Sequence, residues 1–215
     1  MKKLCDFSRV EKIELPRKAV YRLSVYQRCL QRLRDNDVET VSSEALAKAA
    51  GVKSTQLRKD LGYVGQFGTR GLGYNVGKLA EAITAALGST RLQPVILVGI
   101  GNLGSALLRY SGFRKEGFEV IAAFDQVPDK DRVRGTGVPV YDAREMPDYI
   151  RSHAVKMAIL AVPGTAAQTV ANQLVDAGVQ AILNFSPTVL EVPENVYVNN
   201  VDLAIELESL SYFIR

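Results

Sequence analysis

A short apolar run followed by three closely spaced glycines constrains this chain of 215 residues more than any other stretch. Residues 94–98 have the composition of a buried parallel strand. Glycines then stand at positions 99, 101 and 104, and the apolar residues after them recur at helical spacing. A strand, a G-x-G-x-x-G turn and a helix in this order are typical of a dinucleotide-binding fingerprint.

Each glycine has a mechanical role in such a fingerprint. Gly99 permits the tight turn, Gly101 lets the backbone approach a pyrophosphate, and Gly104 lets the helix lie close to the strand. The free N–H groups at the helix start favour phosphate. The loop predicted to bind the cofactor therefore comprises Gly99, Ile100, Gly101, Asn102, Leu103 and Gly104. The alternative is a glycine-rich turn that binds nothing.

An acidic residue follows the fingerprint at the distance expected for a ribose contact. Asp125 ends the apolar run 120–124 and lies 21 residues after Gly104. Its charge would repel a 2′-phosphate, so the sequence predicts NAD(H) in preference to NADP(H).

The rest of the second half alternates strands with helices. We expect strands at 94–98, 120–124, 138–141, 156–162, 181–185 and 196–198, and helices at 102–110, 143–152 and 165–177. This alternation predicts an α/β fold, a doubly wound parallel sheet of Rossmann type with helices on both faces. Ligands bind beyond the carboxyl ends of such strands, so we expect Pro163, Phe185 and Pro187 to line the site, although both loops also suit ordinary turns.

The charge of the chain is unevenly distributed. Residues 1–90 hold 16 Lys and Arg against 9 Asp and Glu, whereas residues 91–215 hold 11 against 14. A basic first part favours nucleic acid as its partner, although a merely basic surface is also common. We expect three parts: residues 1–88, residues 89–199 and a C-terminal helix within residues 200–215.

The basic part contains a helix-turn-helix pattern within residues 42–63. Ser42 or Ser43 suits the cap of a first helix, Gly51 suits its end, and Ser54 or Thr55 suits the cap of a second. The second helix has the side chains that reach phosphates and base edges from a DNA groove. The residues predicted to contact DNA are Lys53, Thr55, Gln56, Arg58, Lys59 and Tyr63. The alternative is a small helical hairpin with a solvated basic face.

A glycine-rich segment, residues 65–74, follows this pattern and suits a short β-hairpin. After a helix-turn-helix it indicates a wing, with Arg70 placed to contact DNA. Asn75 then caps a further helix that Gly88 ends. Together these elements predict a winged-helix DNA-binding domain.

Several functional classes find no support in the sequence. No run approaches the roughly 18 apolar residues of a membrane span, and no apolar N-terminal segment suggests secretion, so we expect a cytoplasmic protein without membrane contact. Cys5 and Cys29 lack zinc-type spacing, so we expect no metal site and no disulfide.

The motifs together resemble the Rex family of bacterial redox-sensing transcriptional repressors. The resemblance runs from about Arg17 to Tyr212. It rests on residues 57–65, 68–74, 99–104, 162–168, 182–187 and 201–203. It implies a homodimer that binds an inverted-repeat operator through its winged helices and leaves the DNA when NADH binds, with NAD⁺ competing.

The resemblance also implies roles for individual residues. Tyr110 would lie near the nicotinamide, and Asp202, at the start of a C-terminal helix swapped between subunits, would pair with Arg28 and Tyr110. Some members carry an aromatic residue where this chain has Leu203. The C-terminal stripe that Phe213 widens would belong to the dimer contact, although its periodicity alone also suits a helix that covers its own sheet.

The competing class is a small NAD-dependent dehydrogenase with a basic extension. Hydride transfer needs a proton donor or acceptor beside the nicotinamide. The one histidine, His153, falls in an expected surface loop, and Tyr149 has no lysine four residues on. We therefore expect a sensor rather than an enzyme, with no catalytic residues.

Overall fold

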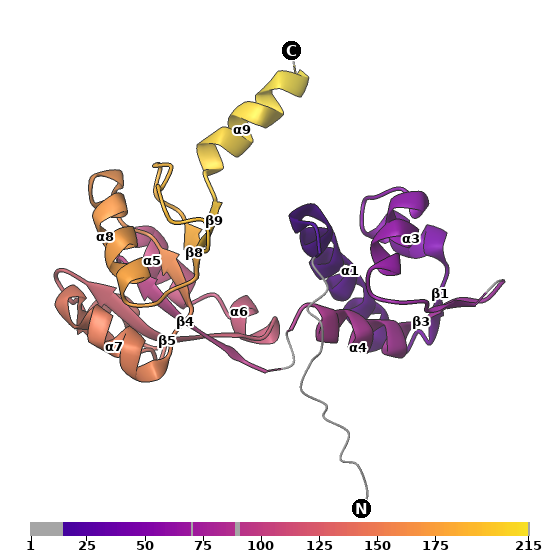
Figure 1. Cartoon of the computed structure of the whole chain (residues 1–215), viewed down its shortest axis with the longest axis horizontal. Helices are drawn as coiled ribbons and strands as arrows, with labels where there is room; N and C mark the ends of the chain where they lie inside the picture. The colour runs from indigo at the N-terminus through magenta and orange to yellow at the C-terminus, as the bar shows by residue number, and fades with distance from the viewer. Residues whose placement is uncertain (1–14, 70, 89–90, 215) are drawn as a thin grey trace, which may run out of the picture. The chain divides into compact units, whose positions relative to one another are not determined.

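A computed structural model of the protein describes residues 15–69, 71–88 and 91–214. Its contacts divide the chain into two compact units, residues 1–91 and 92–215. The first unit is mainly helical, and the second carries the six-stranded sheet, with helices between its strands and one after the last strand (Figure 1).

The first unit is a helical domain with a small antiparallel sheet. Its helices are α1 (Arg17–Asp35), α2 (Ser43–Ala49), α3 (Ser54–Gly62) and α4 (Val76–Ala86). Its strands are β1 (Thr40–Val41), β2 (Gly68–Thr69) and β3 (Gly73–Asn75), in the order β1-β3-β2. The strands β2 and β3 form the hairpin expected for a wing, and the helices enclose one apolar core.

The ends of these helices follow from local hydrogen bonds. The side chains of Ser42 and Asn75 accept bonds from backbone N–H groups in α2 and α4, as the sequence predicts. Gly51 adopts the left-handed conformation expected after α2, with φ of 67°. The prediction that Ser54 or Thr55 caps α3 is wrong: the helix begins one residue earlier, because the N–H of Leu57 donates to the carbonyl of Lys53.

The second unit is built on a parallel sheet in the order β6-β5-β4-β7-β8-β9. The strands are β4 (Gln93–Val98), β5 (Phe118–Asp125), β6 (Val140–Asp142), β7 (Met157–Leu160), β8 (Ala181–Asn184) and β9 (Tyr197–Asn200). The helices are α5 (Asn102–Leu108), α6 (Gly112–Lys115), α7 (Met146–His153), α8 (Gly164–Asp176) and α9 (Leu203–Ser211). Short 3₁₀ turns span Asp131–Val133, Ala143–Glu145 and Tyr212–Ile214.

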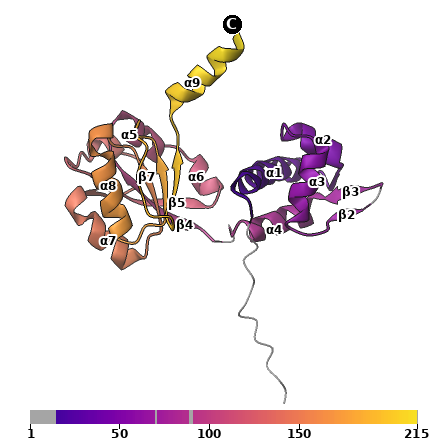
Figure 2. The same cartoon turned by 45° about the horizontal axis from the view of Figure 1, so that its top comes forward.

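Helices cover both faces of this sheet, and Figure 2 shows α8 and α6 on opposite sides of the strands. Successive side chains of β4 pack alternately into the helical layers on the two faces of the sheet. Val95 and Leu97 pack toward the layer of α5 and α6, whereas Ile96 and Val98 pack toward α7 and α8. The near-continuous apolar run that predicted a strand buried on both faces is thereby explained.

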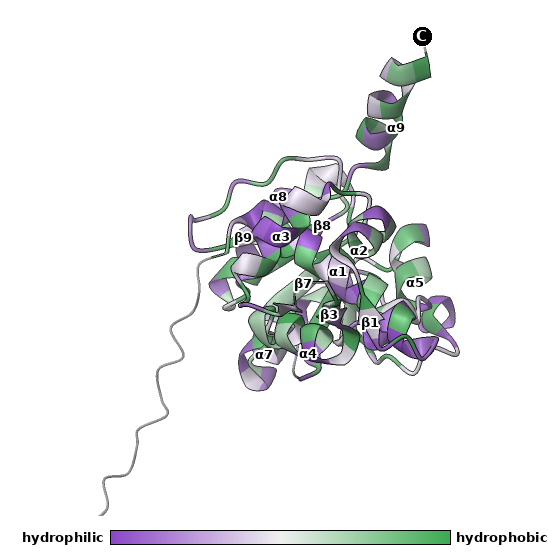
Figure 3. Ribbon diagram, turned by 90° about the vertical axis from the view of Figure 1, so that its right-hand side faces the viewer, coloured by the Kyte–Doolittle hydropathy of each residue, from purple (hydrophilic) through white to green (hydrophobic). Residues whose placement is uncertain are grey.

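The helix α9 does not cover its own sheet. All its side chains are exposed: Leu203, Leu207 and Leu210 are 62%, 67% and 62% exposed, and Phe213, in the 3₁₀ turn after α9, is 77% exposed. The green and purple segments of α9 in Figure 3 show that it mixes apolar and polar residues. Among the described helices, none is both long and apolar enough to cross a membrane.

Candidate functional site

A cleft of about 1090 Å³ opens at the carboxyl ends of β4, β5, β6 and β7. The chain winds outward in opposite directions from β4, toward β5 and β6 on one side and β7 to β9 on the other. A parallel sheet binds its ligand at such a switch point. The cleft is therefore where the glycine fingerprint predicts a dinucleotide.

The three glycines of the loop after β4 differ in what surrounds them. Gly99 has φ of 97°, and a Cβ on it would overlap the carbonyl of Ala161. A Cβ on Gly104 would overlap the carbonyl oxygen of Gly99. A Cβ on Gly101, by contrast, would meet nothing within 4 Å. The first and third glycines thus close the turn, and the second faces open space suited to a pyrophosphate.

Asp125 stands at the end of β5 and holds the glycine loop. Its Oδ2 accepts a hydrogen bond of 2.6 Å from the backbone N–H of Ile100, and its Oδ1 accepts one of 3.0 Å from that of Val127. Each oxygen keeps a further lone pair. The carboxylate can therefore order the loop and still accept hydrogen bonds from ribose hydroxyls.

The loops after β7 and β8 form the other end of the cleft and are tied together. The hydroxyl of Ser186 donates to the carbonyl oxygen of Val162 at 2.6 Å, and Oδ1 of Asn184 accepts from the N–H of Ser186 at 2.9 Å. Both Asn184 and Ser186 are buried. These bonds fix Pro163 and Phe185, which supply apolar surface to the cleft.

Most of the residues predicted to hold the cofactor are brought together here. The residues of that set that line the cleft are Gly99, Gly101, Asn102, Leu103, Asp125, Pro163 and Phe185. Ile100 and Gly104 lie buried beneath the loop and act through backbone packing. Tyr110 and Pro187 are exposed and are not among the lining residues; the ring of Tyr110 rests edge-on against Phe113, with 5.1 Å between centroids.

Sequence reasoning missed one wall of the cleft. Asp142 ends β6, and together with Ala143 and Arg144 after it lines the cleft beside Gln126 and Val127. The rule that selected the loops after β7 and β8 also applies to β6, which places its end beside Asp125 in the sheet register. The sequence placed this strand at 138–141, so its polar end lay outside the expected strand.

A second candidate site is the exposed face of α3. Thr55, Arg58 and Lys59 are exposed on this helix, and Lys53 is exposed at its N-cap. The guanidinium of Arg58 donates to the hydroxyl of Ser43 at 2.9 Å. The face thus presents cations and a hydroxyl, the groups that contact phosphates and base edges.

Gln56 lies on the flank of α3 rather than on this face. Its Nε2 donates to Oδ1 of Asp60 at 2.9 Å. Because an ionised carboxylate only accepts, the amide nitrogen faces Asp60, and the side-chain oxygen and the second N–H of Gln56 are left for another partner. Tyr63, at the C-cap of α3, is half-buried.

The buried carboxylate of Asp60 ties α3 to α1. It accepts bonds of 2.6 and 2.7 Å from the guanidinium of Arg22 and one of 2.8 Å from the hydroxyl of Tyr26. Burial disfavours the charge, but the hydrogen bonds from Arg22, Tyr26 and Gln56 outweigh it and hold the pKa of Asp60 below its ordinary value. Sequence patterning missed this role because an aspartate on a helix is usually exposed.

The wing is the antiparallel hairpin of β2 and β3, with Thr69 opposite Gly73. Gly73 has φ of 87°, and a Cβ there would overlap the carbonyl of Val41, so only glycine fits this crossing. Arg70, predicted to contact DNA from the wing, lies outside the described residues.

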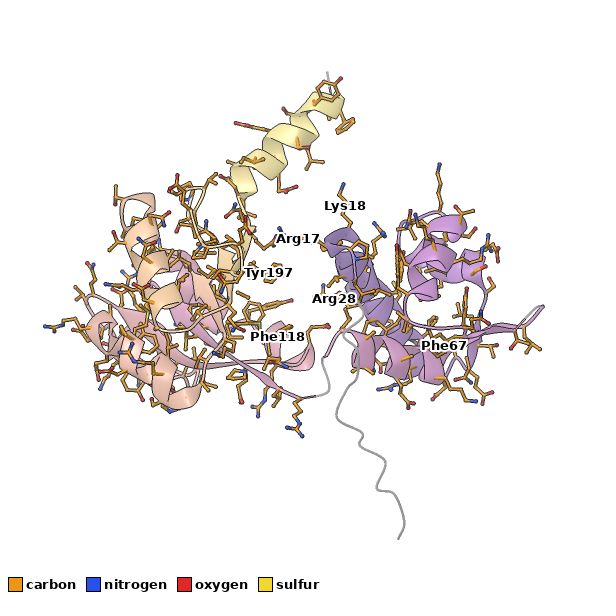
Figure 4. All side chains as sticks on the ribbon, in the orientation of Figure 1. Arg17, Lys18, Arg28, Phe67, Phe118 and Tyr197 are labelled. Atoms are coloured by element: carbon orange, nitrogen blue, oxygen red, sulfur yellow. The ribbon has the colours of Figure 1, made fainter. Side chains whose placement is uncertain are left out.

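The residues expected to form the switch are distributed over the two units. Arg28 is exposed on α1, where Figure 4 labels it. Asp202 is the N-cap of α9, and its Oδ1 accepts from the N–H groups of Ala204 and Ile205 at 2.9 and 3.3 Å. A structural capping role for Asp202 was not expected from the sequence. Leu203 and Phe213 are exposed on the segment after it.

Two protein-family models match the chain. Residues 14–62 match the family described as "Putative DNA-binding protein N-terminus", and residues 90–188 match the "CoA binding domain". CoA and NAD(H) share an adenosine diphosphate group, so a cleft that contacts pyrophosphate and ribose suits either name. The two matches fall on the first and second units.

Curated relatives cover nearly the whole chain. The redox-sensing transcriptional repressor Rex of Pelotomaculum thermopropionicum is 46% identical over 200 residues, which are 93% of this chain and 94% of that protein. The protein of the same name from Streptomyces coelicolor is 48% identical, over 92% of this chain and 77% of its own length.

Solved structures agree with these relatives. The crystal structure of RSP in complex with β-NAD⁺ and operator DNA is 37% identical, with a TM-score of 0.85, and the match covers 94% of this chain and 93% of RSP. RSP, described as a Rex-family repressor, has also been crystallised with β-NADH. That structure is 35% identical, with a TM-score of 0.81, and the match covers 93% of this chain and 94% of RSP. This chain therefore belongs to the Rex family of redox-sensing transcriptional repressors.

Proposed function

We propose that this chain represses transcription by binding operator DNA as a homodimer, and that NADH releases it from the DNA. The observation that carries the proposal is the presence, in one chain, of a winged helix with an exposed basic face on α3 and a cleft suited to a dinucleotide. The matches to RSP bound to β-NAD⁺ with operator DNA, and to RSP bound to β-NADH, support both ligands.

The different affinities of the cleft for NADH and NAD⁺ follow from the charges of the two cofactors. Reduction of NAD⁺ removes the positive charge of the nicotinamide ring. Pro163 and Phe185 give that end of the cleft an apolar wall, where an unpaired cation costs free energy. The residues of the cleft therefore favour NADH, while Asp125 orients the adenosine ribose in both states.

A dehydrogenase is the less favoured alternative, since the curated relatives are named as repressors. Among the described residues that line the cleft there is no His, Lys, Tyr or Cys. Its two carboxylates, Asp125 and Asp142, are at the ends of β5 and β6, where the adenosine ribose is expected. A proton donor at the nicotinamide end is thus not among these lining residues.

The exposed apolar side chains of α9 support a homodimer, since a stripe of this size is usually covered by a partner. A dimer matches the two half-sites of an inverted repeat. A repressor of a bacterial operator acts in the cytoplasm, where we place this chain.

The proposal is tested by titrating NADH and NAD⁺ separately into the protein bound to labelled duplex DNA. The duplex is selected from a random-sequence pool on the protein itself, and binding is followed by fluorescence anisotropy. NADH should lower the anisotropy, and added NAD⁺ should restore it by competition. DNA binding that is unchanged by NADH contradicts the proposal. Oxidation of NADH when carbonyl compounds are added contradicts it as well.

A further inference from the structure

We infer that Asp142 is a second determinant of cofactor choice. It pairs with Arg144, the cation of the cleft, and so prevents Arg144 from binding a 2′-phosphate. The inference rests on the proposed binding of NAD(H). It goes beyond the role of Asp125, which repels the phosphate directly.

The sheet register brings the two carboxylates to the same place. Asp125 and Asp142 are paired neighbours at the carboxyl ends of the parallel strands β5 and β6. Both line the cleft, together with Ala143 and Arg144. An adenosine ribose held by Asp125 therefore has its 2′-position in the same neighbourhood as the Asp142 side chain.

The Asp142–Arg144 pair has two parallel hydrogen bonds. Nε of Arg144 donates to Oδ1 of Asp142 at 2.9 Å, and its Nη2 donates to Oδ2 at 2.6 Å. The Arg144 side chain is 89% exposed, whereas the Asp142 side chain is 22% exposed. The cation is thus open to a ligand from the solvent side, but a carboxylate already occupies its Nε–Nη2 edge and offsets its charge.

The carboxylate itself is held in place by the start of the next turn. Oδ1 of Asp142 also accepts from the N–H of Arg144 at 2.8 Å, and the N–H of Asp142 donates to Glu145 at 3.1 Å. The hydrogen bonds from Arg144 lower the pKa of Asp142 to about 2, so it is charged at neutral pH. Arg144 therefore sits beside a permanent anion.

The charged residues of the cleft are few, so this pair has a large effect on how a 2′-phosphate binds. Of the described residues that line it, Arg144 is the one cation, and the anions are Asp125 and Asp142. A 2′-phosphate entering this end meets two carboxylates and a guanidinium that one of them already neutralises. Discrimination against NADP(H) should therefore depend on Asp142 as well as on Asp125.

The test compares NADH and NADPH binding, by calorimetry and by the fluorescence of the reduced nicotinamide, in a series of variants. Asp142→Asn keeps an effective helix cap while removing the charge. Asp125→Asn alone should weaken NADH and improve NADPH modestly. Adding Asp142→Asn should improve NADPH by a further factor of about ten, which corresponds to roughly 1.4 kcal/mol.

Two further variants make the test specific. Adding Arg144→Ala to the double variant should remove the gain for NADPH, because the freed guanidinium supplies it. The matched control is Asp148→Asn, which breaks the exposed Arg151–Asp148 pair of 2.6 Å on α7, outside the cleft lining, and should change neither affinity. The NADPH gain should also shrink in high salt, where exposed charges are screened.

The outcomes separate this inference from the proposed function. Suppose that the wild-type protein binds NADH but the double variant binds NADPH no better than Asp125→Asn does. This result overturns the role of Asp142 and leaves the proposed function standing. The same holds if the gain survives Arg144→Ala. Wild-type protein that binds neither dinucleotide contradicts the proposed function and this inference with it.

Discussion

The side-chain amide of Asn184 donates a hydrogen bond of 2.9 Å to the side-chain oxygen of Asn200. Asn184 ends β8 and is fully buried, and the same amide nitrogen donates to the carbonyl of Thr188 at 2.8 Å. Asn200 ends β9 and stands two residues before Asp202, the cap of α9. The bond therefore joins the loop that borders the cleft to the strand that leads into α9.

This bond predicts that Asn200→Ala weakens the coupling between the two ligands. Asn200 is exposed, so its truncation should spare folding, and NADH and operator DNA should each bind within about twofold of the wild type. The factor by which NADH weakens DNA binding should fall, because a position that couples two sites changes it by about 0.5–2 kcal/mol. Asn195→Ala, an exposed control in the loop before β9, should leave that factor unchanged. An unchanged factor in Asn200→Ala would exclude the bond from the coupling.

The glycine loop predicts opposite effects for two similar substitutions. Gly101→Ala places a methyl group in open space, so the free protein should keep its stability and its operator binding. The same methyl group would face the pyrophosphate, so NADH should bind at least tenfold more weakly and no longer release the DNA. Gly104→Ala meets the backbone of Gly99 and should destabilise the second unit itself.

Thermal unfolding and NADH titration of both variants check this pair. Tight NADH binding by Gly101→Ala would mean that the cofactor does not pass over that residue.

The Arg22–Asp60 pair predicts a pH-dependent stability of the first unit. The pKa of Asp60 is lowered on folding, so its contribution to the free energy of unfolding is present above its unfolded pKa of about 3.9 and is lost as the pH falls through the folded value. Asp60→Asn removes the buried anion that pairs with the partly exposed Arg22, and this should cost about 3 kcal/mol near neutral pH.

Amide hydrogen exchange of α1 and α3 measures this contribution. Comparing wild type with variant at the same pH removes the intrinsic pH dependence of exchange. The difference should shrink as the buffer becomes more acidic than pH 4. Asp35→Asn, at the exposed end of α1, should leave protection unchanged. A difference between wild type and Asp60→Asn that is constant with pH would refute the ionic account.

The exposed face of α3 predicts weaker DNA binding when its cations are truncated. Lys59→Ala should weaken operator binding and reduce the slope of log affinity against log salt by about one for each phosphate that the lysine neutralises. Arg58→Ala should weaken binding as well, although its bond to Ser43 also contributes to the packing of α2 on α3. Lys115→Ala in α6 removes an equal charge from the second unit and serves as the control. Unchanged operator affinity in both α3 variants would show that this face does not bind DNA.

Much of this molecule could be predicted because its signals are local. The glycine loop, the strand–helix alternation and the caps Ser42 and Asn75 each depend on residues close in sequence. Hydrophobic periodicity then indicated the longer helices to within a few residues, whereas the short α6 was not expected. These signals were sufficient for the winged helix and the Rossmann-type sheet.

The features that were missed depend on contacts between distant segments. Asp142 enters the cleft only through its register with Asp125, which lies 17 positions earlier in the chain. Asp60 is buried because Arg22 and Tyr26, on another helix, satisfy its charge. The stripe on α9 is visible in the sequence, but a single chain does not contain what covers it.

The most direct test of the coupling between DNA and cofactor is the affinity for NADH, measured with and without saturating operator DNA. If both ligands act on one conformational equilibrium, the operator must weaken NADH binding by the same factor by which NADH weakens operator binding. We predict a clear loss of NADH affinity on the DNA, equal to that reciprocal factor. Equal NADH affinities in the presence and absence of operator would contradict the account.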